Sequence, residues 1–119
     1  MRECAQNFTY DGSFLAGRTF KTHAHIQNVT QKIAVGRAAR HMANDGWTIT
    51  SIDESLGIIS ASQTVSYGRG KTVPWNVGIE TKDTGLKISM TISISGGLST
   101  PVEGVRDSFC KMVEDIEGQ

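Results

Sequence analysis

The sequence is short of prolines and of long apolar runs. It has only two prolines in 119 residues, and no run of about 18 apolar residues, which excludes a membrane-spanning helix. Its 12 basic residues balance its 12 acidic residues, so the formal net charge is zero. Because phosphate backbones are bound by a basic excess or a basic stripe, this balance argues against nucleic acid as the main partner.

Cysteine is also scarce, since the chain contains only Cys4 and Cys110. No CxxC spacing occurs, which argues against a zinc ribbon or a thioredoxin-like site. The two residues could form a disulfide in an oxidising compartment or remain two free thiols, and the sequence leaves both open. Cys110 adjoins the apolar stripe of the last predicted helix, which indicates burial and low reactivity.

A chain of this length fits one domain. Residues 1–17 are polar and rich in turn formers, so we expect a flexible N-terminal arm followed by a single α+β domain over 18–119. No signal-peptide pattern is present, as in a cytosolic protein or in a secreted protein after processing.

Alternation of apolar and polar residues predicts five strands. The first covers 18–26, with His23 and His25 on its polar face. The others cover 47–54, 58–66, 72–81 and 86–95, with an irregularity expected near Ile52. The inward residues of the first and last of these strands are Phe20, Thr22, Ala24 and Ile26, and Leu86, Ile88, Met90, Ile92 and Ile94.

Two segments have helical periodicity. One is expected to begin at an N-cap Asn28 with Gln31 completing a capping box, and to end before Gly46. The other is expected to begin with Thr100 as N-cap and Pro101 in the first helical position. Its apolar stripe contains Val102, Val105, Phe109, Met112, Val113 and Ile116.

The predicted order is therefore β-α-β-β-β-β-α. Short connections between consecutive strands predict a mostly antiparallel sheet. Each strand has one apolar face and each helix one apolar stripe, so we expect a two-layer sandwich with both helices on one face. The other face is rich in serine, threonine, lysine, asparagine and histidine, and is open to water or to a partner.

His23 and His25 are the main candidates for a metal site. They lie two residues apart on one strand face, and imidazole is a common zinc ligand. A site needs further ligands, and neither Glu80 nor Cys4 is required by its spacing to supply one. We therefore expect no metal here and interpret the pair as solvated polar side chains.

No residue pattern predicts catalysis or cofactor binding. The Gly-rich segment 67–71, YGRGK, lies between two strands and lacks phosphate-loop spacing. No GxSxG elbow is present, and the carboxylates of Asp53, Glu54, Asp115 and Glu117 fall at a turn and a helix end. The expectation is a protein that is not an enzyme and has no cofactor.

The stretch ARHMANDGWTITSIDESLGIISAS, a helix ending in a Gly-aromatic pair before a strand and a turn, resembles small bacterial envelope lipoproteins. With the closing TPVEGVRDSF helix, residues 18–117 are similar in layout to the helix-grip-like domains of the lipoprotein subunit of the outer-membrane β-barrel assembly machinery. Cys4-Ala5-Gln6 resembles the start of a mature lipoprotein, which implies a lipid on Cys4 and a precursor signal peptide ending just before it. Met1-Arg2-Glu3 departs from a lipobox.

The resemblance implies a periplasmic or outer-membrane-attached domain, with a cytoplasmic protein as the alternative. The favoured function is a non-catalytic protein-interaction or scaffold module that binds a protein through its polar sheet face or a sheet edge. Membrane contact would come only through the lipid on Cys4. The alternative is a small-ligand- or metal-binding module that uses the face near His23 and His25, or a pocket under the helices. A cytosolic domain with an enzymatic role ranks last.

Overall fold

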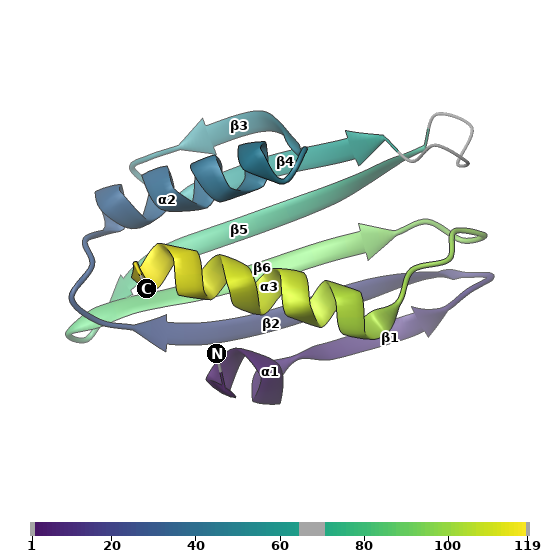
Figure 1. The fold of residues 1–119 in the computed structure, drawn as a ribbon, viewed down its shortest axis with the longest axis horizontal. Helices are drawn as coiled ribbons and strands as arrows, with labels where there is room; N and C mark the ends of the chain where they lie inside the picture. Colours follow the sequence, from purple (N-terminus) through teal and green to yellow (C-terminus); the bar gives the residue numbers. More distant parts are fainter. Residues whose placement is uncertain (1, 65–70, 119) are drawn as a thin grey trace.

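The computed structural model describes residues 2–64 and 71–118. An antiparallel sheet of six strands in the order β1-β2-β6-β5-β4-β3 forms one layer, and α2 and α3 lie side by side across one of its faces (Figure 1). The elements in chain order are α1 (Arg2–Asn7), β1 (Thr9–Ser13), β2 (Gly17–Ile26), α2 (Gln31–Asn44), β3 (Thr48–Asp53), β4 (Ile58–Thr64), β5 (Thr72–Lys82), β6 (Gly85–Ile94) and α3 (Val102–Glu117).

The predicted fold class is confirmed. From β2 onward the order is β-α-β-β-β-β-α, as the periodicity predicted. The alternation also assigned the faces correctly, because the inward residues of β2, β5 and β6 are buried beneath the helices. In the part of the chain described here, no helix is long and apolar enough to cross a membrane.

The expected flexible arm was wrong, because its residues form α1 and β1. β1 pairs with residues 17–21 of β2 and leaves the edge of 22–26 unpaired. The α1 segment covers that edge: Glu3 Oε1 accepts from the backbone N–H of His25 at 2.7 Å, and Asn7 donates to the carbonyl of His23 at 3.0 Å. An uncovered strand edge invites pairing with another chain, so α1 protects the sheet here.

The structure also corrects the predicted lipid anchor. Cys4 forms a disulfide with Cys110 of α3, with a Cα–Cα distance of 5.6 Å. Its sulfur is therefore bonded already and has no valence left for a thioether to lipid. The disulfide connects α1 to α3 across a sequence separation of 106 residues, and it resolves the choice between paired and free thiols that the sequence left open.

Both predicted helix starts shift toward the C-terminus. The N-cap of α2 is Thr30, whose hydroxyl accepts from the backbone N–H of Ile33, while Asn28 takes a positive φ of 66° in the preceding turn. The N-cap of α3 is Pro101, with no side-chain cap. The end of α2 was predicted correctly, since Gly46 follows it with a φ of 88°. The irregularity in β3 lies between Ile49 and Ser51, just before the predicted position.

Candidate functional site

Two adjoining clefts flank α3. The first, the apolar cleft, lies between α3 and the end of the sheet and has a volume of about 410 Å³. Its lining is mainly hydrophobic and includes Trp47, Val73, Ile92, Ile94, Pro101 and Val105. These side chains come from β5, β6, α3 and the residues just before β3 and α3.

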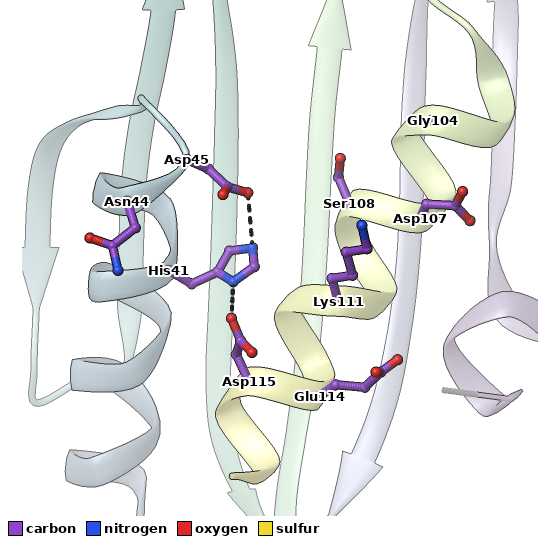
Figure 2. Close-up of a pocket in the computed structure, with 9 residues that line it drawn as sticks. All are labelled: His41, Asn44, Asp45, Gly104, Asp107, Ser108, Lys111, Glu114 and Asp115. Carbon is purple, nitrogen blue, oxygen red and sulfur yellow. Dashed lines mark hydrogen bonds and ion pairs between the residues drawn. The ribbon is translucent and has the colours of Figure 1, made fainter. Parts of the chain in front are cut away.

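The second, the polar cleft, has a volume of about 560 Å³ and lies between α2 and α3 (Figure 2). It is lined by His41, Asn44, Asp45, Gly104, Asp107, Ser108, Lys111, Glu114 and Asp115. Gly104 and Ser108 line both clefts. The two clefts therefore meet at these residues of α3. Together they are called the α3 groove, with an apolar part against the sheet and a polar part between the helices.

His41 is the most buried polar residue of the groove, with only 7% of its side chain exposed. Its Nδ1 is hydrogen-bonded to Asp115 on α3, and since a carboxylate only accepts, Nδ1 carries the proton. Its ring meets the ring of Trp75 edge to face at 6.3 Å between centroids. The residue thus connects α2 to α3 above the core, as Figure 2 shows for the Asp115 contact.

The second ring nitrogen of His41 is left without a hydrogen bond. Nε2 is buried and lies 3.3 Å from Oδ2 of Asp45, but the two atoms are not aligned as a hydrogen bond. Buried polar atoms usually have a partner, so an orphaned one in a cleft marks a place where a ligand can supply it. Depending on its protonation, Nε2 can accept from a bound molecule or donate to it.

Sequence reasoning did not identify His41 as a site residue. The signal was present in the helical period, because Ala34, Ala38 and His41 follow one another at spacings of four and three residues. Ala34, Ala38 and Met42 are fully buried, and His41 shares their face. A histidine that falls within an apolar stripe is buried with it, and a buried histidine requires partners.

His23 and His25 lie on the outer sheet face, as predicted, with ring centroids 6.2 Å apart. Neither proposed extra ligand joins them: the sulfur of Cys4 is in the disulfide, and Glu80 lies on β5, beyond the intervening strand β6. Within 2–64 and 71–118 no three His, Cys, Asp or Glu residues form a metal-ligand cluster. His25 Nδ1 instead contacts Glu3 Oε2 at 2.8 Å.

That contact changes the acidity of Glu3. Burial tends to raise the pKa of this carboxyl, but the hydrogen bonds from the backbone N–H and the ring of His25 lower it more. The net result is a pKa below the ordinary value of 4.5. Glu3 therefore holds α1 on the edge of β2 as a carboxylate.

Asp53 and Lys71, the described residue of the Gly-rich segment 67–71, do not line the groove. Asp53 accepts from the backbone N–H of Leu56 and the hydroxyl of Ser55, and these bonds lower its pKa within the β3–β4 turn. The Gly-rich segment lies outside the described residues except for Lys71, which donates to the carbonyl of Gly96 at 3.2 Å. Neither contact brings a polar group into the α3 groove.

The fold and groove define a class of protein: an α+β domain in which a C-terminal helix lies across an antiparallel sheet above a cleft. Among solved structures, the crystal structure of Ara h 8.0201 is similar to this chain with a TM-score of 0.62 and 14% sequence identity. The likeness covers 84% of this chain and 94% of the other and shows a common fold. No family model and no curated protein matches the sequence.

Proposed function

We propose that this domain binds a small, largely apolar molecule in the α3 groove. The observation that carries the proposal is the apolar cleft of about 410 Å³ between α3 and the sheet. Ligand sites in proteins are concave, mostly apolar and roughly 300–1,000 Å³ in volume, with a few polar groups that fix orientation. The cleft has this size and this lining, with Ser108 at its border with the polar part.

The polar cleft supplies the orienting groups. His41 Nε2 is buried and lacks a hydrogen bond, and Ser108 and Lys111 line the same space. A ligand with one polar end would bury its apolar part against Val105 and Ile92 and extend that end toward His41. Nε2 lies near Asp45 without an aligned hydrogen bond, and a ligand that completes such a bond would offset part of the cost of burying this atom.

We further propose that the domain works outside the cytosol, in agreement with the envelope location implied by the resemblance. Disulfides persist in the periplasm and in secreted proteins and are rare where glutathione and thioredoxin keep thiols reduced. The Cys4–Cys110 bond supports this location. The proposed envelope location therefore rests on the disulfide and no longer on a lipid attached to Cys4.

Titration with the neutral dye N-phenyl-1-naphthylamine tests the binding proposal, because its fluorescence rises in apolar sites. Ser108 lines both clefts, so Ser108→Trp fills the groove. Glu103 is exposed on α3 and lines neither cleft, so Glu103→Trp is the matched control. We expect the native protein and the control to bind the dye alike and the Ser108 variant to bind at least tenfold more weakly. Equal binding by both variants would contradict the proposal.

A second candidate function, strand-mediated protein binding, is favoured by the β3 edge. β3 is the last strand of the sheet, and among the described residues it pairs only with β4. Three large apolar side chains around it are unusually exposed: Ile52 by 46%, Leu56 by 63% and Ile58 by 43%. A partner strand added to this edge would cover the unpaired backbone and these side chains.

Photocrosslinking in the source cells tests this candidate. A crosslinker at Ile52 is expected to trap one discrete protein, and a crosslinker at Tyr10 on the opposite edge strand is the control. The same products from both positions, or no product from Ile52, would rule out a specific partner at β3.

A further inference from the structure

The outer sheet face contains a basic hollow that the α3 groove does not use. β2 and β6 are neighbours there, in a register that places Lys21 opposite Thr91, His23 opposite Ser89 and His25 opposite Lys87. These residues alternate with buried ones, so all of them point to the face without helices. Directly opposite side chains in a sheet have Cβ atoms about 4.5–5.5 Å apart, and diagonal neighbours about 7–8 Å.

The hollow arises because short side chains stand between long ones. Ser89 and Thr91 form its floor, and Lys21, His23 and Lys87 form its walls around a volume of about 350 Å³. Asn7 and Thr9 close it at the junction of α1 and β1. Ser89 is the central position, because His23 lies opposite it and Lys87 precedes it by two residues on the same face.

The charge of the hollow has one sign. Its lining contains two lysines and a histidine and no aspartate or glutamate. Within residues 2–64 and 71–118 neither Lys21 nor Lys87 forms an ion pair. Two carboxylates lie near the hollow but outside its lining. Glu3 on α1 is already bonded to His25. Glu80 on β5 lies opposite Lys87 and forms no ion pair with it.

We infer that this hollow binds a phosphate-type oxyanion above Ser89. The lysine ammonium groups supply the charge, and the hydroxyls of Ser89 and Thr91 and the ring of His23 supply hydrogen-bond donors. Two unpaired lysines repel a metal cation, so the same geometry that argues against a metal on His23 favours an anion there. The site is separate from the α3 groove, which lies on the other face of the sheet.

The oxyanion could belong to a soluble phosphate compound or to a lipid headgroup, and the shared chemistry is the phosphate group. For an exposed site, a charge about 4 Å from the anion contributes about 1 kcal/mol in water. The loss of one lysine is therefore expected to weaken binding about fivefold.

NMR titration of the ¹⁵N-labelled protein with inorganic phosphate, at ionic strength held constant with chloride, is the first arm of the test. The amides of Lys21, His23 and Ser89 are expected to shift in a saturable way. Lys21→Gln and Lys87→Gln should each weaken binding about fivefold, while Lys82→Gln should leave it unchanged. Lys82 is a suitable control because it is exposed on the same face of β5 but lies outside the hollow.

Flotation with phosphatidylglycerol vesicles, against phosphatidylcholine vesicles, is the second arm. Flotation that is lost in the Lys21 and Lys87 variants and kept in the Lys82 variant identifies a lipid headgroup as the source. Phosphate binding without flotation identifies a soluble phosphate compound. The inference is overturned if neither probe binds, or if Lys82→Gln weakens binding as much as the other two variants.

Discussion

Removal of the Cys4–Cys110 disulfide should cost this domain a large part of its stability. The bond closes a loop of 106 residues, and the chain-entropy model gives about 4.8 kcal/mol for a loop of that size. Disulfides typically contribute about 2–4 kcal/mol when measured, so we expect Cys4→Ala with Cys110→Ala to lose roughly 3–5 kcal/mol. Small domains are stable by about 5–15 kcal/mol in total.

The structure also predicts where the loss appears first. α1 is tied to α3 by the disulfide and is held on β2 by the hydrogen bonds of Glu3, Asn7 and Thr22. Without the disulfide, this short helix should leave the edge, and the His25 amide should exchange with solvent faster than amides of β5. Urea unfolding followed by circular dichroism gives the free energy, and NMR hydrogen exchange gives the location.

A matched control separates the two effects. Glu3→Gln removes the carboxylate that accepts from His25 and keeps the disulfide, so it should raise exchange at His25 with a loss of only about 1 kcal/mol. The reasoning is refuted if the double alanine variant loses less than about 1 kcal/mol, or if His25 exchange does not change in it.

Four further predictions follow from individual contacts. Because Glu3 has a lowered pKa in the folded state, its contribution to α1 docking is complete above the ordinary carboxyl range and is lost as pH falls through the folded value. The protection factor of the His25 amide, which is the intrinsic exchange rate at a given pH divided by the observed rate, should therefore fall on acidification in the native protein but not in Glu3→Gln. Asp115→Asn should lower the free energy of unfolding by about 1 kcal/mol in thermal unfolding. The loss is small because Asp115 is half exposed and solvent partly screens its bond to His41. Asp107→Asn on the same helix is the control and should have little effect. Phe109 is fully buried against Phe8 and Trp75, so Phe109→Ala should cost about 3–5 kcal/mol in urea unfolding. Acid-quenched alkylation of the protein in its source cells should find both cysteines blocked, and modification of both would contradict a location in an oxidising compartment.

The sequence was most informative where the chain alternates strictly. β2, β5 and β6 are long and have one apolar face, so period alone gave their extent and their inward residues. The antiparallel arrangement was inferred from the short connections between consecutive strands, and the order of the strands was not predicted. The amphipathic stripe did the same for α3. These patterns report burial directly, because a side chain at the wrong phase would leave the core.

Two parts of the fold could not be read from local patterns. β1 is exposed along its whole length, so it has no apolar phase to detect, and α1 has only six residues. Both are held by partners distant in sequence: β1 by β2, and α1 by Cys110 and the β2 edge. The helix starts were misplaced for a similar reason, because Gln31, predicted to complete a cap, instead donates to the carbonyl of Ile79 at 2.8 Å.

The candidate site also could not be predicted from local sequence patterns. The residues of the α3 groove come from α2, β5, β6, α3 and the segment that precedes β3. They are far apart in the sequence, so no motif or regular spacing could have predicted that they line one groove. His41 could have been placed in the buried stripe by its period, but its partner Asp115 lies 74 residues away. The position of His23 and His25 on the polar face was predictable from alternation, whereas their basic neighbours on β6 required the strand order.

The most direct test of the account is the location of a bound apolar molecule. With N-phenyl-1-naphthylamine bound to the methyl-labelled protein, intermolecular NOEs should connect the dye to methyl groups of Val105, Ile92 and Ile94, which line the apolar cleft. NOEs to Ile52 and Ile58 at the β3–β4 hairpin in their place would put the dye on the exposed edge and contradict a ligand site under α3.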